Sequence, residues 1–411
     1  LAAAVMEGLC YNSIKVSDMP ARYLTQREIE IERRRVEGLP MNVSYQDLQE
    51  LLDPFFRSYM CKDGRGFYVV CPSHKNHARR CLEVLGLYDE MIEEGLQEED
   101  DTYKPQSEWK SDTSLGVYPM PKFWADKLAA RMKEVFMTRT SHEWKRMFGR
   151  AGIPGAPQRW LQEWINDEYA ETSGLMIDVW DPEYGEMIQP GPVVWMEESG
   201  EEALSPAPRR WVEFDEALKT LQKLRTEIPD VEDGIEQEGW LSGVRVLDMC
   251  NVIAGPHSAS YLARFGAEVI KIDPATPLYD SWNTVVYGLS QGRGKKSILA
   301  DVKSEHGRKV FEDLVKSVDV IFWNAPDSQI KRMGLDADSL RKLNPEAIFC
   351  KLDCFSGVRR GTRTDYIGYD DLVQAITGIM LRFGGAMDRP EEHAHVGTID
   401  VMCGFGGALA V

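Results

Sequence analysis

Long apolar runs are missing from this sequence of 411 residues. A membrane-spanning helix needs about 20 consecutive apolar residues, and no stretch approaches that length. The basic start and short apolar segment of a secretory signal peptide are missing too. We therefore predict a cytoplasmic protein that has no membrane partner.

Positive charge is also scarce. Lys and Arg number 48 against 66 Asp and Glu, which gives a formal net charge of −18. An acidic surface repels phosphate backbones, so we expect no nucleic-acid partner. An anionic cofactor would have to bind where Lys and Arg are locally concentrated.

The eight cysteines are few and widely spaced. No pair has the C-x-x-C spacing of zinc sites, so we expect free thiols in a reducing compartment. Two histidines, His393 and His395, lie next to Glu391 and Glu392. Nothing else at ligand spacing supports a metal there, and we interpret the segment as a polar loop. We predict no metal.

The chain divides into two parts of different character. Residues 1–229 mix helical patterns with short strands and turns, which indicates small-domain material of the α+β type. Residues 230–242 are acidic and have little to bury, so we place a linker there. Residues 243–411 alternate apolar strands with helices, the pattern of an α/β fold with a doubly wound, Rossmann-like parallel sheet.

Individual elements follow from the same patterns. In the first part we expect a strand over 67–70 and helices over 23–36, 128–136 and 141–148, the last with Ser141 as its N-cap. In the second part we expect strands over 244–249, 268–273, 297–302, 319–323 and 347–352. The helices expected there cover 256–265, 305–317, 328–342 and 370–382.

The loop at 251–256 connects a strand to a helix N-terminus, where backbone N–H groups suit a phosphate or a carboxylate. A dinucleotide site would require G-x-G-x-x-G, but only Gly255 and Gly266 are glycine in this region. From the spacing alone, a purely structural βαβ unit is a simpler interpretation than a dinucleotide site.

Five segments of the second part occur in a set order. They are 243–273 with A-G-P at 254–256, R-G-K-K-S-I at 293–298, residues 324–334, residues 340–345, and G-Y-D-D-L-V-Q-A-I-T-G at 368–378. Together they resemble the front half of the class III CoA transferases, the family of carnitine and formyl-CoA transferases. This resemblance implies an enzyme that transfers coenzyme A from an acyl-CoA to a small carboxylate.

The resemblance also implies an active site. Asp400, with Gly404 four residues later, matches the family's nucleophile; without the resemblance it would be an Asp stabilised by a helix dipole. Ile253 replaces the Gln of formyl-CoA transferase, so formate and oxalate are not expected substrates. The residues implied in coenzyme A binding are Val252, Ile253, Ala254, Arg293, Lys295, Lys296, Asn324 and Phe355. Pro326 and Gly292 depart from the Arg and Asn that are frequent in the family.

In the implied mechanism the Asp400 carboxylate attacks the acyl thioester and forms a mixed anhydride. The CoA thiolate then returns to give an aspartyl-CoA thioester and releases the donor acid. The acceptor carboxylate attacks next, and a second exchange yields acceptor-CoA. A desolvated carboxylate is a competent nucleophile for this exchange.

The first part resembles the back half of the same family. Y-M-C-K-D-G at 59–64, F-M-T-R-T-S-H-E-W at 136–144 and A-G-I-P at 151–154 carry the likeness. A back half before a front half implies a tandem protein of which this chain is an interior fragment. Its expected partners are the missing halves, or a second copy in a homodimer.

Three functions stay open. The tandem layout is similar to that of members that transfer coenzyme A from acetyl-CoA to dimethylsulfoniopropionate and release dimethyl sulfide. A transferase for carnitine-like or other carboxylates, without lyase activity, is the second function, and a non-catalytic nucleotide-binding βαβ protein is the third. A sulfonium cation would favour an aromatic pocket. Trp282, Tyr287 and Trp323 are available for it, although each is better explained as core.

Overall fold

The computed structural model describes residues 53–411 except 72–73, 118–119, 227–238, 277, 280–287, 289–290 and 391–396. The helix expected over 23–36 and the polar loop at 391–395 lie outside the described residues, as does most of the expected linker. Every cysteine of the described residues is a free thiol, as predicted. Within these ranges no helix is both long and apolar enough to cross a bilayer.

The second part contains a five-stranded parallel sheet of strand order β10-β9-β6-β7-β8. Its strands are β6 (Arg245–Asp248), β7 (Glu268–Asp273), β8 (Lys295–Leu299), β9 (Val320–Trp323) and β10 (Ile348–Lys351). The predicted doubly wound sheet is therefore confirmed. Strand β8 begins two residues before the predicted start at 297, so the strand includes the two lysines.

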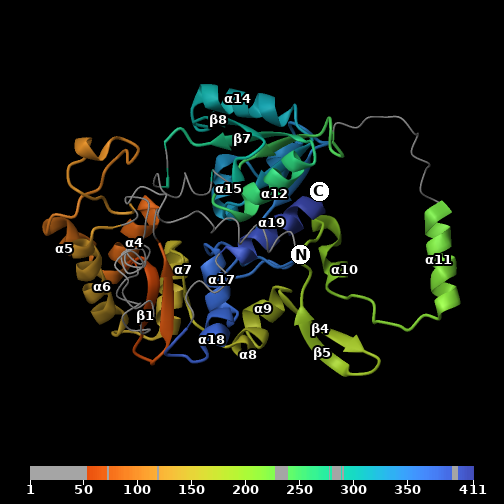
Figure 1. The fold of residues 1–411 in the computed structure, drawn as a ribbon, viewed down its shortest axis with the longest axis horizontal. Coiled ribbons are helices and arrows are strands. Elements are labelled where there is room, and N and C mark those ends of the chain that lie inside the picture. Colours follow the sequence, from red (N-terminus) through yellow and green to blue (C-terminus); the bar gives the residue numbers. More distant parts are fainter. Residues whose placement is uncertain are drawn as a thin grey trace, which may run out of the picture.

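Helices cover both faces of this sheet. Successive strand residues point to opposite sides, and apolar side chains on both sides are buried against helices. On one face Leu247 packs with helices α14 (Glu305–Val315), α15 (Asp327–Met333) and α16 (Ala337–Arg341). On the other face Val246 packs with α12 (Ala254–Arg264) and α19 (Thr398–Ala410). Figure 1 shows these two layers of helices around the sheet.

Two predicted helices are each divided by a glycine. The helix expected over 328–342 is split into α15 and α16 because Gly334 has a left-handed φ of 62° and caps α15. The helix expected over 370–382 becomes α17 (Asp370–Ile376) and α18 (Ile379–Gly384), separated at Gly378 with φ 89°. Left-handed glycine is a common helix terminator.

The first part is a small α+β unit, as predicted. Its antiparallel sheet has the order β1-β2-β3, with β1 (Phe56–Met60), β2 (Gly66–Val70) and β3 (Gly155–Pro157). The helices packed around it are α4 (Lys75–Leu85), α5 (Tyr88–Glu93), α6 (Lys122–Phe136) and α7 (Ser141–Ala151), with a 3-10 turn η3 (Gln106–Glu108). Aromatic rings fill the core, including Tyr59 stacked on Phe136 with centroids 4.8 Å apart.

The predicted N-cap of α7 is wrong by one residue. Thr140 is the cap: its side chain accepts the Glu143 N–H, and the Glu143 carboxylate accepts the Thr140 N–H at 2.8 Å. This capping box satisfies two donors of the first turn. Ser141 instead donates its hydroxyl to Asp63 at 2.8 Å, which ties α7 to the turn after β1.

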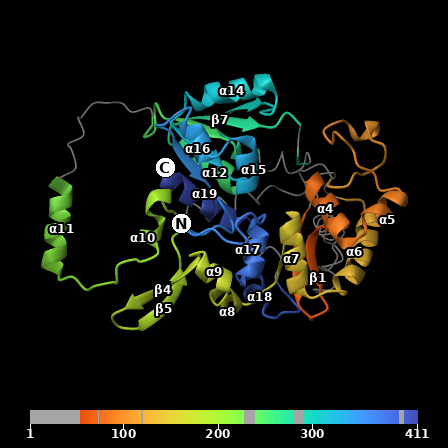
Figure 2. The ribbon, with the colours of Figure 1, turned by 180° about the vertical axis from the view of Figure 1, so that it is seen from behind.

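A connecting region follows, comprising α8 (Leu161–Ile165), α9 (Glu168–Thr172), the hairpin β4 (Met176–Asp181) and β5 (Gly185–Pro190), η4 (Glu197–Ser199), α10 (Gly200–Ala203) and α11 (Phe214–Thr226). Figures 1 and 2 show α11 standing apart from both sheets. Its Phe214 is 77% exposed, and Trp211 just before it is 90% exposed.

The two parts share an apolar core. Tyr68, Val70 and Ala156 of the small sheet pack against Leu372 and Met380 of α17 and α18. Backbone contact reinforces the packing where Arg159 N donates to Ala375 O at 2.9 Å. Figure 2 shows α17 lying between the small sheet and the large one. Residues from both parts can therefore meet around α17.

Candidate active site

The candidate site begins where the direction of strand addition reverses in the large sheet. From β6 the chain continues through α12 to β7 on one side, whereas β9 and β10 lie on the other side. In open parallel sheets, ligands bind in the crevice beyond the carboxyl ends of the strands at such a point. The residues that follow β6 and β9 there are the 249–253 loop and Asn324.

Asn324 fixes the loop by two hydrogen bonds. Its Oδ1 accepts the Asn251 N–H at 2.9 Å, and its Nδ2 donates to the Asn251 carbonyl at 2.8 Å. The next residue, Val252, has φ 69° and is the one non-glycine residue with positive φ among those described. A β-branched residue in this region is strained by about 1–3 kcal/mol. Such strain at a ligand crevice indicates a functional constraint on the loop.

A buried ion pair fixes the end of β6 and the start of α12, the two elements joined by the loop of the crevice. Lys295 Nζ donates to Asp248 Oδ2 at 2.8 Å and to the Pro256 carbonyl at 2.5 Å, and both charged side chains are almost fully buried. Burial alone would raise the pKa of Asp248, but Lys295 and Lys271 outweigh it and hold the pKa below its ordinary value. Lys295 therefore ties the start of α12 to the end of β6.

The three basic residues implied in coenzyme A binding do not act as one cluster. Lys295 points into the protein, whereas Lys296 is 73% exposed and pairs with Glu268 at 2.6 Å. Arg293 is exposed just before β8. The alternation of a strand separates Lys295 from Lys296. Of the three side chains, Arg293 and Lys296 are accessible to a ligand from solvent.

Helices α12 and α19 approach closely because glycine faces the contact. A Cβ on Gly404 would lie 2.9 Å from the Ala254 carbonyl, and one on Gly407 would lie 2.5 Å from Ser258 Oγ. The two helices thus run in the same direction along the contact. Asp400 is one turn before Gly404 on the same helix face. We infer that Asp400 lies beside the start of α12 and the 251–253 loop.

Asp400 has a second carboxylate as its neighbour. Its backbone N–H donates to Asp370 Oδ2 at 2.8 Å, and Asp370 is 5% exposed at the start of α17. Burial raises the pKa of Asp400 well above its ordinary value, and the charge of Asp370 raises it further. A poorly solvated, repelled carboxylate is a more reactive nucleophile than one in water.

Residues of both parts form a cluster of aromatic and imidazole groups at the start of α17, the helix that Asp370 begins. Tyr369 OH lies 3.2 Å from Tyr279 OH and 3.5 Å from His77 Nδ1. The rings of His74 and His77 stack at 3.9 Å. Burial lowers the pKa of His74 to about 4 and that of His77 well below its ordinary value, so both are neutral near pH 7. Sequence reasoning missed this cluster, since nothing local links His77 to Tyr369.

The remaining predicted residues lie elsewhere. Phe355 is 5% exposed in the core shared by the two parts, and its carbonyl accepts the Tyr169 hydroxyl at 2.8 Å. Trp323 is 7% exposed in the core of the large sheet. Trp282 and Tyr287 lie outside the described residues. In the described part of the chain no group of three or more potential metal ligands is present.

The candidate site thus combines a strand-order reversal, a strained loop and two neighbouring carboxylates, of which Asp370 is buried and Asp400 is half-buried. The model of CoA-transferase family III matches residues 38–210 and 241–411. The chain belongs to CoA-transferase family III, as predicted from its motifs.

Particular relatives agree with this assignment. The chain is 52% identical over 418 aligned positions to the CoA-transferase/lyase DddD of Marinomonas sp. (strain MWYL1), with 100% of the chain and 50% of that protein covered. It is 34% identical over 185 residues to the succinate–glutarate CoA-transferase of Agrobacterium fabrum, covering 42% of the chain and 46% of that protein. The chain spans about half the length of these relatives.

Among solved structures, a CAIB/BAIF family protein from Brucella suis is 29% identical. The match covers 42% of the chain and 48% of that protein, with a TM-score of 0.37.

Gly404→Ala tests whether close helix packing positions Asp400. The added methyl would overlap the Ala254 carbonyl and force α19 away from α12. We expect a loss of about 1–3 kcal/mol in the free energy of unfolding and a fall in transfer rate on the order of 100-fold. Thermal unfolding and steady-state assays of the full-length protein measure both quantities.

Gly406→Ala is the matched control on the same helix. Its added methyl would lie 3.5 Å from Val193 Cγ1, an ordinary contact, and replacing a helical glycine stabilises by up to about 1 kcal/mol. Equal losses in the two variants would contradict the proposed role of the α12–α19 contact.

Asp400→Asn tests the raised pKa of Asp400. In the folded protein the pKa of this carboxyl is raised, so it stays protonated at pH values above its ordinary pKa of 3.8. The free energy of unfolding therefore falls as the pH rises from 3.8 toward the pKa of the folded state. Because Asn cannot ionise, the variant does not lose this free energy of unfolding as the pH rises. We expect the variant to unfold at a higher temperature than the wild type at pH 7, with a gap that closes toward pH 4.

The exposed Asp388→Asn is the control for this measurement, and we expect its unfolding temperature to follow the wild type at each pH. Calorimetry between pH 4 and pH 8 provides the comparison. A lower unfolding temperature for Asp400→Asn at pH 7, with no dependence on pH, would show that the carboxylate is not destabilised by folding.

Proposed function

We propose that the protein transfers coenzyme A between carboxylates and that Asp400 is the covalent carrier. The observation that carries this proposal is the contact of half-buried Asp400 with Asp370, whose charge adds to the effect of burial in raising the pKa of Asp400. Repulsion raises the free energy of the charged carboxylate before reaction, and acylation removes its charge. Acylation of Asp400 is thereby favoured relative to an exposed carboxylate.

The Asp400 carboxylate attacks the acyl carbonyl, forming a C–O bond while the C–S bond breaks and CoA thiolate leaves. The thiolate attacks the aspartyl carbonyl of the anhydride and expels the donor acid, which leaves an aspartyl-CoA thioester. The acceptor carboxylate attacks that thioester and again releases thiolate. Attack of the thiolate on the acceptor carbonyl yields acceptor-CoA and free Asp400.

Protein groups around Asp400 supply binding and charge stabilisation in this cycle. Backbone N–H groups of the loop at 252–254, near the start of α12, are suited to the oxyanions that form at each attack. The exposed Arg293 and Lys296 suit the phosphates of coenzyme A. Lys295 acts as a positioning residue, since its ammonium holds Asp248 and Pro256.

The proposed acceptor is dimethylsulfoniopropionate, with acetyl-CoA as the donor. The full-chain similarity to a protein named CoA-transferase/lyase supports this choice. Once the acid is a thioester, its α-proton is more acidic. A base takes that proton, a C=C bond forms between the α- and β-carbons, and the β-carbon–sulfur bond breaks to release dimethyl sulfide.

A transferase for other carboxylates is the second candidate. The 34% identity to a succinate–glutarate CoA-transferase favours it for the part of the chain that aligns. In that case the site would exchange coenzyme A between two acids without elimination.

We further infer that the complete protein is a tandem transferase and that its remaining halves cover α11. The order of the motifs and the half-length match to the relatives support a tandem layout. The exposed apolar side chains of Trp211, Phe214 and Leu221 support a covering partner, because such a band is costly in water. A second copy of the chain is the other candidate for this surface.

Acylation of Asp400 is the direct test of the nucleophile. Full-length protein is incubated with acetyl-CoA, quenched with hydroxylamine or borohydride, and mapped by peptide mass spectrometry. We expect the modified peptide to contain Asp400, and we expect Asp400→Asn to remove the label while Asp388→Asn retains it. A label on Asp370 instead would overturn the assignment.

Release of dimethyl sulfide tests the acceptor. We expect full-length protein with acetyl-CoA and dimethylsulfoniopropionate to release the sulfide into the headspace, and Asp400→Asn to abolish release. The isolated chain 1–411 should be inactive, because the proposed tandem enzyme needs its other halves. Acyl-CoA formation without sulfide would favour the second candidate. Absence of both products with every donor tried would favour a non-catalytic nucleotide-binding protein.

A further inference from the structure

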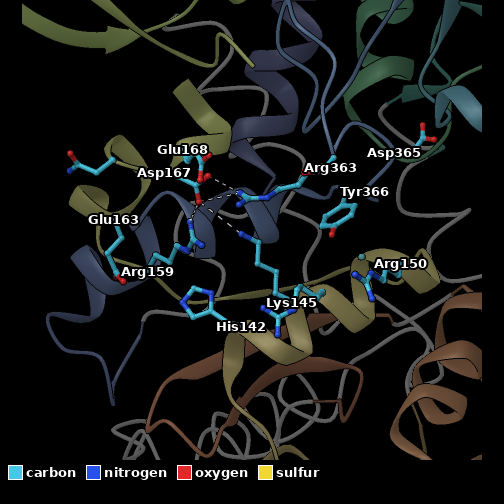
Figure 3. Close-up of a pocket in the computed structure, with 14 residues that line it drawn as sticks. His142, Lys145, Arg150, Arg159, Glu163, Asp167, Glu168, Arg363, Asp365 and Tyr366 are labelled. Atoms are coloured by element: carbon cyan, nitrogen blue, oxygen red, sulfur yellow. Dashed lines mark hydrogen bonds and ion pairs between the residues drawn. The ribbon is translucent and has the colours of Figure 1, made fainter. Parts of the chain in front are cut away.

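A cavity of about 840 Å³ lies between α7, the α8–α9 region and the loop at 361–366. None of its lining residues belongs to α12 or α19. Figure 3 shows Lys145, Arg159 and Arg363 converging on Asp167 from three different segments of the chain. Lys145, Arg159 and Asp167 belong to the first part of the chain, and Arg363 belongs to the second part. The cavity therefore depends on the packing of the two parts.

The floor of the cavity holds three cations and one carboxylate. Asp167 Oδ2 lies 2.6 Å from Arg159 Nη1 and 3.9 Å from Lys145 Nζ, and Asp167 Oδ1 lies 2.9 Å from Arg363 Nη1. Asp167 also caps α9 by accepting the Tyr169 N–H at 3.0 Å, so it is fixed in place. Counted formally, the floor carries two positive charges beyond those that Asp167 balances.

Of these three cations, Lys145 has the fewest hydrogen-bond and ion-pair partners among the described residues. Its side chain is 9% exposed, and within the described residues its ammonium has an ion pair at 3.9 Å but no hydrogen bond. Three N–H donors on a buried ammonium normally find acceptors. Burial, and then the charges of Arg159 and Arg363, lower the pKa of Lys145 to about 7 against the opposing effect of Asp167.

Groups at the edge of the cavity do not supply the missing acceptor. Glu163 is paired with Arg65 at 2.8 Å, and Glu168 and Asp365 are exposed. On the α7 side the edge carries His142, Arg146 and Arg150, all exposed. At the edge the two arginines are matched in number by the carboxylates of Glu168 and Asp365, so the positive excess of the cavity lies at its floor, on a chain whose total charge is −18.

We propose that this cavity binds a phosphate group, at a site separate from Asp400. A dianion matches the two uncompensated charges of the floor, and its oxygens can accept from Lys145 and from the guanidinium groups around it. A monocarboxylate would balance only one of these charges. The phosphate is either inorganic or part of a larger molecule such as coenzyme A, whose remainder the cavity has room to admit.

Phosphate binding should be coupled to a proton on Lys145. A dianion in contact with the ammonium favours its charged form and raises its pKa above 7. At pH 8 free phosphate is already mostly the dianion and Lys145 is mostly neutral, so Lys145 would take up a proton from the buffer as phosphate binds at that pH. Simple screening of surface charge by phosphate would produce no such uptake at a defined stoichiometry.

Isothermal titration calorimetry of the full-length protein with inorganic phosphate tests the proposal. We expect one site per chain, and a binding enthalpy that changes between buffers of different ionisation enthalpy in the sense of proton uptake. Lys145→Met keeps the length of the side chain and removes its charge. We expect it to weaken binding about tenfold or more and to abolish the proton uptake.

Two further variants keep the test decisive. Lys309→Met, on the exposed face of α14, should bind as the wild type does. Arg150→Gln, at the exposed edge, should weaken binding by a few-fold and leave proton uptake intact, even if Lys145→Met folds poorly. Unchanged affinity in both Lys145→Met and Arg150→Gln, or no measurable binding of millimolar phosphate, would overturn the proposal.

The source of the phosphate is decided by competition. If the group belongs to coenzyme A through its 3′-phosphate, coenzyme A displaces inorganic phosphate and dephospho-coenzyme A does not. If the ligand is free phosphate, neither compound competes. Asp400→Asn should retain phosphate binding in either case, so failure of this proposal and failure of the proposed transfer reaction are distinguishable.

Discussion

The close contact between α12 and α19 is the constraint on which the candidate active site depends. Gly404 faces the Ala254 carbonyl, and any larger residue would separate the helices. Because Asp400 stands one turn before Gly404, the same contact decides where the carboxylate lies relative to the strained loop at Val252. The pattern of an Asp followed by Gly four residues later is thus a packing requirement as well as a chemical one.

The charges near the crevice perform two different tasks. Asp248 and Lys295 are buried as a hydrogen-bonded pair, and their combination keeps Asp248 ionised and fixes the start of α12. Among the residues that the structure describes, no cation pairs with Asp400; burial and then the charge of Asp370 raise its pKa. One carboxylate is therefore stabilised to hold the scaffold, whereas the other is destabilised where covalent chemistry is proposed. Perturbed groups of the second kind are typical of functional sites.

Much of the fold could be predicted because strands of a parallel sheet are short apolar runs with clear ends; the strand at 268–273 was predicted to the residue. The breaks at Gly334 and Gly378 could not be predicted, since a glycine inside a helical pattern gives no sign that its φ will be positive. For the candidate site, the motifs predicted Asp400 and Asn324, whose roles stay predictions. They did not reveal that Lys295 faces inward, because the direction of a side chain depends on where β8 begins.

Two of the contacts that sequence reasoning missed cross between the two parts of the chain. His77 approaches Tyr369 across 292 positions of the sequence, and Asp167 pairs with Arg363 across 196 positions. Such contacts exist only when α17 and the small sheet pack together. Because Asp370 begins α17 and also accepts the Asp400 N–H, displacement of the small sheet would disturb the carboxylate pair as well as the phosphate cavity. The two sites therefore share one structural support while using charges of opposite sign.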